Sequence, residues 1–579
     1  MDNKIIHVDC CFITNKLLYY VCVLDGVPGR KVIKQEDLIA AVRENPDMYD
    51  VKIVGFDNIT RPDNSDIELL DIGTFYLFEA LYSESESSLN YVKRNVYNEM
   101  ENYLTRDDLL NKVGIVSGMR NTGKTVILQQ LTCCPACKGN SAYITLNYEQ
   151  YDIAALCGYI STLYRRVGIR YFFIDEVTRA DGFVDYSNGL TDKWAVGKTM
   201  WIVLSGTDSL SFSLAQQESL YHRFIEVKTT PMGYTEYSRL TGKVDVVDYI
   251  RSGGVFWGND PNEAVLDDYL RTSVVENIYN TIHNMRRSVP IATKLMPLSR
   301  DSLYALCYSI CQYGVLEFVK SKLNDMDDDA FNEAVKDVLG KSSITVTADG
   351  RKRIRLASGK PMLHSEPFPE AQVDAAIKLM EMCGFLYRVD EFSENQLYDG
   401  HALVFDQTGV AREFVRVVLR GICLSNEFPA ASVQRILSRV EKNTDGMILE
   451  SACMSAVIRY TQPMDKLLHV FKYRWSSGEH EIDICVLDRR DGVLHLFEVK
   501  RDVESTDSNR GLRRGEKYSK RHLANDSCVQ PLLNRFKPTG LTHMLLYRGE
   551  STKKNIDCID VFHMNISEFL VDLENGGIF

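Results

Sequence analysis

Over the first sixty residues, short apolar runs such as KIIHVDCCFI and KLLYYVCVL are separated by polar turns. Apolar runs of this length, divided by turn sequences such as DGVPGR, are typical of β-strands. The pattern predicts a small β-rich domain at residues 1–62, with one helix near residues 36–45 and a linker at 58–66. We recognise no catalytic set in this part.

A different pattern begins near residue 112, where apolar runs alternate with helical segments. The runs are VGIVSG, AYITLN, RYFFIDEV and MWIVLSG. Strands that are buried on both faces of a sheet read as near-continuous apolar runs of this kind. Residues 90–245 are therefore predicted to form an α/β domain around a parallel sheet.

The remaining chain mixes long helical periodicity with later strands. Residues 246–440 are mostly helical in pattern, and DAAIKLMEMCGFLYRVDEF reads as a helix, a glycine and a strand, which suits a winged-helix-like unit. Residues 441–579 combine helices with several strands and form the last predicted domain. We therefore predict an α/β multidomain protein.

Composition narrows the class of protein. The 579 residues are too many for one core, and 45% hydrophobic and 25% charged residues are ordinary for a globular protein. The net charge of -12 argues against a generally basic nucleic-acid-binding surface, although a local basic patch can still exist. No stretch approaches the ~20 apolar residues of a membrane span, and we see no signal peptide. We expect a cytoplasmic protein without a membrane segment.

Most of the 15 cysteines lie inside apolar runs, which favours reduced, buried thiols. The segment CCPAC contains Cys133, Cys134 and Cys137 and includes a CxxC pair. A zinc site needs about four ligands, and no second pair or histidine lies near in the sequence. We interpret the segment as a turn with incidental thiols.

The segment GMRNTGKT, residues 118–125, fits the pattern GxxxxGK[ST] in full. It follows an expected strand and precedes a helix, which is the context that a phosphate-binding loop requires. Its N–H groups would curl round the phosphates of ATP, and the helix N-terminus adds partial positive charge. Lys124 would reach the β- and γ-phosphates, and the Thr125 hydroxyl would hold Mg²⁺. The other loop residues expected to bind the nucleotide are Gly118, Asn121, Thr122 and Gly123.

Two carboxylates, Asp175 and Glu176, follow the apolar run YFFI. Asp175 would bind the Mg²⁺ shell and Glu176 would polarise the attacking water, so the pair predicts hydrolysis as well as binding. The next strand ends in SGTD, where Ser205 or Thr207 could sense the γ-phosphate or merely end the strand. Arg223 is a further candidate as an arginine finger or sensor, although such an arginine is more often structural.

These motifs occur in an order that resembles a known family. GMRNTGKT, FFIDEVTRADGF, IVLSGTDS, HRFIEVKTTPMGYTEY and DYIRSGG follow one another within roughly residues 90–510. The chain resembles the prokaryotic AAA-type ATPases that join a P-loop module, a winged helix and a C-terminal restriction-endonuclease-like domain. The small N-terminal domain lies outside that family pattern. The strand end SGTD departs from the family's usual TGS, so the sensor residue stays open.

The stretch HEIDICVLDRRDGVLHLFEVKR, residues 480–501, reads as a β-hairpin closed by an Asp-Gly turn. Side chains alternate along a strand, so Glu498 and Lys500 share a face and Asp483 can lie opposite them. In PD-(D/E)XK nucleases, which have the pattern D…ExK, the carboxylates hold Mg²⁺ and the lysine acts on the attacking water. The resemblance adds Glu450 from the preceding helix. The expected catalytic set is thus Glu450, Asp483, Glu498 and Lys500, with Asp483 and Glu498 as metal ligands.

Two interpretations of the hairpin remain open. Charges on one face of a hairpin are usually a solvated surface, and ExK is a short, common string. Against this, residues 510–521 hold six basic residues and one acidic residue in a chain that is acidic overall. Such a patch beside a metal site suits a nucleic-acid backbone, although a charge run is more often a solvated loop.

Three hypotheses for function follow. The first is an ATPase coupled to a metal-dependent nuclease-like domain that acts on DNA or RNA. The second is a nucleotide-controlled regulatory or scaffolding ATPase whose C-terminal domain is an inert interaction module. The third is an ATPase that remodels a protein partner. ATP and Mg²⁺ are the expected cofactors in each, and the sequence leaves open whether the chain forms a homo-oligomer.

Overall fold

The structure is a computed structural model, and its described residues begin with the N-terminal strands and become more continuous after residue 86. The helix expected near residues 36–45 and the linker at 58–66 lie outside the described residues. The described residues are 4–14, 17–24, 30–34, 49–53, 68–70, 74–77, 86–109, 112–137, 141–146, 152–162, 164, 169–191, 200–217, 219–221, 223–252, 254, 267–284, 290–324, 344–346, 352–354, 368–393, 398–425, 430–462, 467–474, 481–500, 510–524, 529–556 and 558–579.

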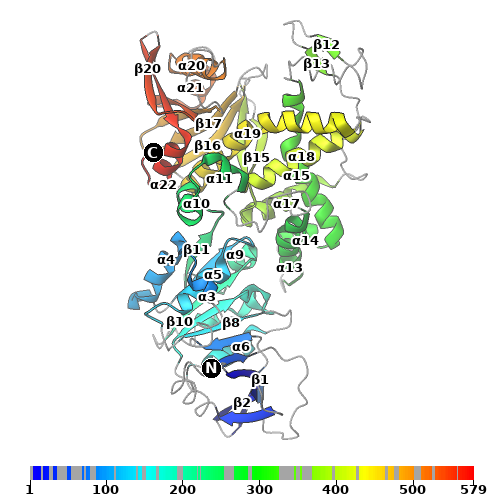
Figure 1. Ribbon diagram of the computed structural model, residues 1–579, viewed down its shortest axis with the longest axis vertical. Coiled ribbons are helices and arrows are strands. Elements are labelled where there is room, and N and C mark those ends of the chain that lie inside the picture. Colours follow the sequence, from blue (N-terminus) through cyan, green and yellow to red (C-terminus); the bar gives the residue numbers. More distant parts are fainter. Residues whose placement is uncertain are drawn as a thin grey trace. The chain divides into compact units, whose positions relative to one another are not determined.

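The chain folds as two units (Figure 1). The first consists of residues 1–230 and 276–297, and the second of residues 231–275 and 298–579. Each unit contains its own sheet. The structure is thus α/β and multidomain, as the apolar patterns predicted, while the division into four domains stays a prediction.

The first unit begins with strands and continues with alternating strands and helices. Its strands are β1 (Lys4–Thr14), β2 (Leu17–Leu24), β3 (Arg30–Lys34), β4 (Tyr49–Ile53), β5 (Glu68–Leu70), β6 (Thr74–Leu77), β7 (Val113–Gly118), β8 (Ser141–Thr145), β9 (Tyr171–Asp175), β10 (Trp201–Gly206) and β11 (Phe224–Thr229). Its helices are α3 (Glu86–Leu89), α4 (Asn95–Leu104), α5 (Lys124–Thr132), α6 (Ile153–Thr162), α7 (Phe183–Tyr186), α9 (Ser209–Gln217), α13 (Glu276–Asn284) and α14 (Pro290–Leu295), with short 3-10 turns η1 (Asp107–Leu109) and η3 (Val177–Arg179).

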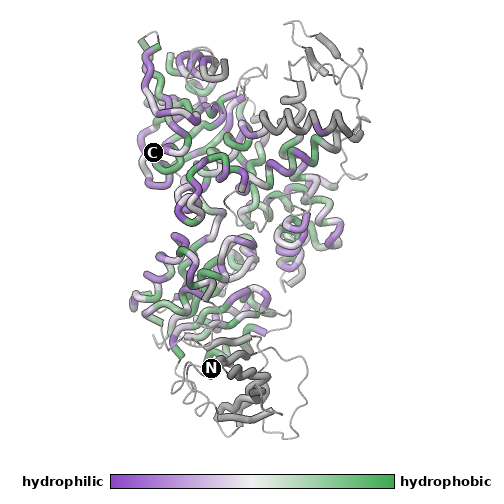
Figure 2. Tube along the Cα trace, viewed as in Figure 1, coloured by the Kyte–Doolittle hydropathy of each residue, from purple (hydrophilic) through white to green (hydrophobic). Residues whose placement is uncertain are grey.

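Five neighbouring strands of the first unit are parallel, in the spatial order β11-β7-β10-β9-β8. All six residues of β7 are buried, as are all but the first residue of β9 and of β10. This burial on both faces explains the near-continuous apolar runs, which Figure 2 shows as hydrophobic stretches. The predicted parallel sheet is confirmed.

Helices cover both faces of this sheet. On one face, Tyr97 and Met100 of α4 and Leu128 of α5 pack with Val116 and Phe173 of the strands. On the other face, residues of α6, α7 and α9 pack with the alternate strand residues, among them Ile115, Ile174 and Leu204. This packing holds α5 on one face of the sheet, with its N-terminus just after the loop that follows β7.

The N-terminal strands extend the same sheet. Among the described residues, β6 pairs antiparallel with β8, and β4, β1, β2 and β3 continue outward from β6, so that eleven strands share one sheet. In Figure 1, β1 and β2 lie beyond β8. The strands expected in residues 1–62 are present, but they do not form a sheet of their own. An open sheet edge at β8 would leave unpaired backbone groups, which β6 pairs.

The second unit holds the middle and C-terminal parts of the chain. Its helices are α10 (Tyr234–Thr241), α11 (Val246–Ser252), η4 (Leu270–Val275), α15 (Arg300–Asn324), α17 (Glu370–Met382), α18 (Thr408–Ser425), α19 (Ala430–Thr461), α20 (Arg510–Leu523), α21 (Gln530–Phe536) and α22 (Ile566–Glu574). Its strands are β12 (Ile344–Val346), β13 (Lys352–Ile354), β14 (Leu386–Ser393), β15 (Tyr398–Phe405), β16 (Leu468–Arg474), β17 (Glu481–Asp488), β18 (Val493–Val499), β19 (Gly540–Tyr547), β20 (Thr552–Ile556) and β21 (Ile559–Asn565).

Eight described strands of this unit form a mixed sheet in the order β15-β14-β16-β17-β18-β19-β21-β20. The predicted hairpin is confirmed, since β17 and β18 pair antiparallel, and β19 then pairs parallel with β18. Helices α19 and α22 pack on one face through residues such as Leu449 and Phe569. The expected sequence of helix, glycine and strand is present as α17, Gly384 and β14.

Two global expectations concern membranes and cysteines. Within the described part of the chain, no helix is both long and apolar enough to cross a membrane. Of the cysteines that the structure describes, none forms a disulfide, and most are buried; Cys558 is exposed.

Candidate nucleotide and metal sites

The loop at residues 118–125 joins the end of β7 to the start of α5, and two glycines shape it. Gly118 has φ 148° and Gly123 has φ 85°, a region that favours glycine. A Cβ atom at Gly118 would also clash with the backbone carbonyl and hydroxyl oxygens of Thr229. Asn121 adopts φ 65°, which asparagine tolerates better than most residues. These positions let the backbone curl above the N-terminus of α5.

Lys124 is the first residue of α5 and is only 5% exposed. Its Nζ donates to the carbonyl oxygen of Met119, at 2.8 Å, inside the same loop. Burial lowers the pKa of Lys124, and the nearby Glu176 and Asp175 carboxylates oppose that shift. The ammonium group is thus held over the loop, where a phosphate group could replace the carbonyl as its partner.

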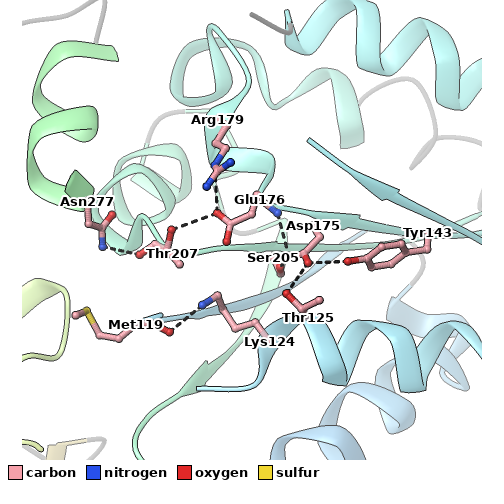
Figure 3. Close-up of polar contacts among 10 residues, drawn as sticks. All are labelled: Met119, Lys124, Thr125, Tyr143, Asp175, Glu176, Arg179, Ser205, Thr207 and Asn277. Carbon is pink, nitrogen blue, oxygen red and sulfur yellow. Dashed lines mark hydrogen bonds and ion pairs between the residues drawn. The ribbon is translucent and has the colours of Figure 1, made fainter. Parts of the chain in front are cut away.

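Asp175 lies at the end of β9 and collects hydrogen bonds from three elements (Figure 3). Its Oδ2 accepts from the Thr125 hydroxyl at 2.7 Å and from the Tyr143 hydroxyl at 2.7 Å. Its Oδ1 accepts from the Ser205 hydroxyl at the end of β10. The carboxylate is 2% exposed, so these donors fix its orientation.

Glu176 is the next residue and points along a different direction. It has φ 55° and is half-buried, and its Oε2 accepts from the Thr207 hydroxyl at 3.2 Å. Arg179 Nε lies 3.7 Å from the same oxygen. Asn277 of α13 donates to the Thr207 carbonyl at 2.7 Å, which ties this helix to the strand end (Figure 3). The two alternatives for the sensor thus have different partners, Ser205 with Asp175 and Thr207 with Glu176.

Arg94 is a residue of this site that sequence reasoning missed. Its guanidinium is buried and donates to the Thr122 carbonyl of the loop at 2.6 Å and to the Thr230 carbonyl after β11 at 3.1 Å. Its side chain also lies beside Gly123, where an added Cβ would sit 3.6 Å from Arg94 Cδ. Arg94 therefore ties the loop to the neighbouring strand.

Arg223 is not brought to the loop within this chain. It precedes β11, and its backbone pairs with Val113 at the start of β7, whereas the loop follows the end of β7. A strand rises about 3.3 Å per residue, so the six residues of β7 separate Arg223, at the amino end of the strands, from the loop at their carboxyl end. The other sequence candidates, residues 118–125 with Asp175 and Glu176, lie together.

A second group of candidate residues lies on the C-terminal hairpin. Lys500 Nζ lies 2.5 Å from Glu498 Oε1 and 3.9 Å from Asp483 Oδ2. Asp483 Oδ2 also accepts from the backbone N–H of Val499 at 2.7 Å. The predicted arrangement, with Asp483 facing Glu498 and Lys500 across the hairpin, agrees with these contacts.

The carboxylates of this group are crowded and buried. Burial, followed by the Asp483 charge, raises the pKa of Glu450 and of Glu498 to about 8 in each case. Burial also raises the pKa of Asp483. Burial lowers the pKa of Lys500, but the carboxylates of Glu498, Asp483 and Glu450 outweigh it and hold that pKa above its ordinary value. The site thus gathers several carboxyl groups with raised pKa values around one lysine.

The donor atoms suit a hard cation. Oxygen atoms of Glu450, Glu481 and Asp483 lie within 4.8 Å of one another, and no other such group occurs among the described residues. Glu498 Oε2 is buried and has no hydrogen-bond partner among the described atoms. Carboxylate oxygens are the ligands that Mg²⁺ prefers. Glu481 lies two residues before Asp483 and therefore on the same face of the strand, but the sequence analysis did not assign it to the metal.

The basic segment 510–521 forms helix α20. The helix packs on β19 and β21, and a Cβ at Gly515 would lie 3.5 Å from Lys500 Cε. Arg513 and Lys517 are exposed. The basic residues therefore lie on a helix, and Gly515 of this helix is next to Lys500. The solvated loop that the sequence analysis left open is not what the structure has here.

Residues 110–238 match the family described as an AAA domain. This segment is an AAA domain. The match spans the phosphate-binding loop and the strands β7 to β11, but it includes neither Arg94 nor Asn277. None of the curated proteins compared with the chain gives a significant match.

Solved structures that are similar to this chain include the following three, each with a sequence identity of 16% or less. PCH-2 of C. elegans has 16% identity over 45% of this chain and 70% of that one, with a TM-score of 0.21. Cdc6p of Pyrobaculum aerophilum has 12% identity over 59% and 99%, with a TM-score of 0.23. The Aeropyrum pernix ORC1 protein, solved in complex with DNA, has 12% identity over 62% and 98%, with a TM-score of 0.22. Similarity at this level supports no argument about this chain.

Replacing Arg94 tests its role as an anchor of the loop. Arg94→Ala removes a charged donor from the Thr122 carbonyl, and hydrogen bonds of this kind contribute about 1.5–3 kcal/mol. We expect the Kd for ATP to rise about tenfold or more, measured by isothermal titration calorimetry. The matched control is Arg106→Ala, since Arg106 is exposed and bonds to Asp108. Equal affinities for both variants would contradict the anchoring role.

The crowded carboxylates predict a pH-dependent stability in the absence of metal. A folded-state pKa of about 8 at Glu450 means that the folded protein binds this proton more tightly than the unfolded chain. The corresponding stability is present at low pH and is lost as the pH rises toward 8. Glutamine cannot ionise, so Glu450→Gln should melt higher than the natural chain in EDTA, by about 2 °C or more at pH 9.

The measurement compares the Tm of both proteins from pH 6 to pH 9. The difference between them should grow as the pH rises to about 8, because Glu450 loses its proton over that range while groups outside the cluster contribute equally to both proteins. Glu370→Gln is the control, since Glu370 is exposed at the start of α17. A difference that stays constant or shrinks with pH would speak against the buried, protonated carboxyl.

Proposed function

We propose that the AAA domain binds ATP together with Mg²⁺ and hydrolyses it. The observation that carries this proposal is the 2.7 Å hydrogen bond between the Thr125 hydroxyl and the Asp175 carboxylate, directly beside Lys124. Neighbouring ligands of an octahedral Mg²⁺ lie about 2.9 Å apart, so the two oxygens have the spacing and the chemistry of a hard-ion site. Thr125 and Asp175 would hold the ion, which would neutralise charge on the β- and γ-phosphates.

The loop residues bind and orient the nucleotide. Backbone N–H groups of residues 118–125 point at the phosphates, and the N-terminus of α5 adds partial positive charge. Lys124 exchanges the Met119 carbonyl for a phosphate oxygen, and its ammonium group then balances the charge of the γ-phosphate. Arg94 keeps the loop in shape by holding the Thr122 carbonyl.

Hydrolysis requires a base beside the γ-phosphate. Glu176 follows Asp175 directly, and its carboxylate is held by the Thr207 hydroxyl and by Arg179. We assign it to orient the attacking water and accept its proton. Through Thr207, Asn277 of α13 contacts the same strand end, so movement of this helix would reach the base.

The Glu176→Gln variant separates binding from hydrolysis. Glutamine keeps the size and can still bond to Thr207, but it cannot accept the proton. We expect the ATP affinity to stay within about threefold and kcat for phosphate release to fall about 100-fold or more, as is typical for loss of a general base. The control is Glu226→Gln, a glutamate of β11 that bonds to Ser117 and Gln216. Undiminished hydrolysis in Glu176→Gln would refute the assignment.

We further propose that the C-terminal domain is a metal-dependent, nuclease-like module that acts on nucleic acid. In chain order it presents helix α19, the antiparallel strands β16, β17 and β18, helices α20 and α21 and the strand β19, which pairs parallel with β18. The grouping of Glu450, Asp483, Glu498 and Lys500 and the adjoining basic helix support the proposal.

Each residue of this module has a defined part. Glu450, Asp483 and Glu498, together with Glu481, would hold a divalent cation, which would stabilise charge on the scissile phosphate. Lys500 orients the attacking water, since its ammonium group lies between two carboxylates. The basic residues of α20 contact the phosphate backbone without reading its sequence. The winged-helix-like unit within residues 246–440 stays a proposal from the resemblance.

The alternative of an inert interaction module makes a different prediction. In a module without catalysis, the close ion pair of Lys500 with Glu498 would serve only to neutralise a buried charge. Supercoiled plasmid incubated with the full chain and Mn²⁺ or Mg²⁺ should be nicked, with and without ATP. Asp483→Asn, which can still accept from Val499, should reduce nicking about 100-fold or more.

Asp488→Asn is the matched control, because Asp488 ends the same strand and pairs with Arg490 away from the cluster. Its activity should equal that of the natural chain. No nicking under any condition, with normal ATP hydrolysis, would favour the inert module and would leave the ATPase proposal intact.

A further inference from the structure

The cysteines of CCPAC lie directly after α5, the helix that starts with Lys124 and Thr125. Cys134 is 2% exposed and Cys137 is 0% exposed, and their sulfur atoms lie 3.3 Å apart in a hydrogen bond. The backbone forms a turn here, because Cys137 N–H donates to the Cys134 carbonyl at 3.0 Å. The interpretation as a turn is correct, but the thiols are paired rather than incidental.

The two thiols have unequal chemistry. The hydrogen bond with the Cys137 thiol and the backbone N–H groups of Cys137 and Ala136 outweigh burial and lower the pKa of Cys134 to about 7. The same hydrogen bond, followed by burial, raises the pKa of Cys137. Burial and the Cys134 charge raise the pKa of Cys133 to about 12. Two sulfur atoms in contact, one with a lowered and one with a raised pKa, are the arrangement of a nucleophilic and a resolving cysteine.

We propose that Cys134 and Cys137 form a redox-active dithiol that a hydroperoxide converts into a disulfide. The Cys134 thiolate attacks one peroxide oxygen, which gives a sulfenic acid at Cys134 and releases hydroxide. Cys137 then attacks the Cys134 sulfur, the new S–S bond forms, and water leaves with the Cys137 proton. The proton that Cys134 lost on forming its thiolate converts the hydroxide into water, so in total the dithiol loses two electrons and two protons and hydrogen peroxide is reduced to two molecules of water.

The burial of the two sulfur atoms and the exposure of the turn between them favour a small peroxide as the oxidant. Both sulfurs are buried, so a small peroxide reaches them more easily than a bulky disulfide such as oxidised glutathione. Pro135 and Ala136 of the turn are exposed, so the turn lies at the surface and can let the sulfurs approach to the ~2 Å of a disulfide. In a reducing compartment such disulfides are usually transient and redox-sensing.

A metal site is the competing explanation for clustered cysteines. It needs at least three ligand atoms close together, and among the described residues only Glu450, Glu481 and Asp483 meet that condition. Tyr97 and Glu101 of α4 interact electrostatically with the pair, and the Tyr97 hydroxyl donates to Glu101 at 2.8 Å. The two sulfur atoms are thus close enough to form a disulfide, and the described residues supply no third ligand.

The test uses the full chain with Cys558→Ser as background, because Cys558 is exposed and would oxidise independently. Reduced protein is treated with hydrogen peroxide, denatured and alkylated, and its peptides are analysed by mass spectrometry. We expect a peptide in which Cys134 is joined to Cys137, and we expect dithiothreitol to release it. If both thiols remain open to alkylation, the proposal is overturned.

Matched variants locate the chemistry. Cys133→Ser should form the disulfide at the natural rate, whereas Cys137→Ser should stop at a sulfenic acid that dimedone traps on Cys134. Cys134→Ser should slow oxidation of Cys137 about tenfold or more, because the stabilised thiolate is gone. If a folded Cys133→Ser variant failed to form the disulfide, Cys133 would be part of the reaction and the proposed pair of Cys134 and Cys137 would be wrong. Circular dichroism checks that each variant is folded. If a variant is unfolded, the peptide analysis of the chain with Cys133, Cys134 and Cys137 intact decides the proposal.

Discussion

The candidate nucleotide site depends on one geometric constraint, the parallel pairing of β7, β10 and β9. Parallel strands deliver their carboxyl ends to the same edge of a sheet, so the glycine loop after β7 meets the carboxylate at the end of β9. There the Thr125 hydroxyl bonds to Asp175, and Ser205 at the end of β10 closes the set. If one strand ran in the opposite direction, these side chains would lie at opposite edges of the sheet.

The two sites handle buried charge in different ways. Asp175 is satisfied by hydroxyl donors from three elements, so the carboxylate is ready before any ligand arrives. The hairpin instead crowds carboxylates around Lys500, and burial holds two of them near a pKa of about 8. Such a cluster destabilises the metal-free fold at high pH, and a bound cation would offset that repulsion. This cost is hard to explain for a surface without a ligand.

Much of the fold and of both candidate sites was predictable from the sequence, because their residues belong to short, continuous motifs. The loop 118–125 and the pair Asp175 and Glu176 each follow an apolar run, and the hairpin around Asp-Gly fixes the face of Asp483 through the two-residue period. Contacts between distant segments were not predictable. Arg94 reaches carbonyls 28 and 136 residues away, and β6 joins β8 through pairing that no local pattern records. The opposite position of Arg223 likewise follows only from strand register.

The central claim is that the loop at residues 118–125 grips a triphosphate through a hydroxyl and a carboxylate that share Mg²⁺. Calorimetric titration of ATP into the full chain, with Mg²⁺ and with EDTA, tests it most directly. The account predicts binding of one ATP per chain, with an affinity about tenfold or more higher when Mg²⁺ is present. Absence of binding in both conditions, or an affinity that Mg²⁺ does not change, would contradict it.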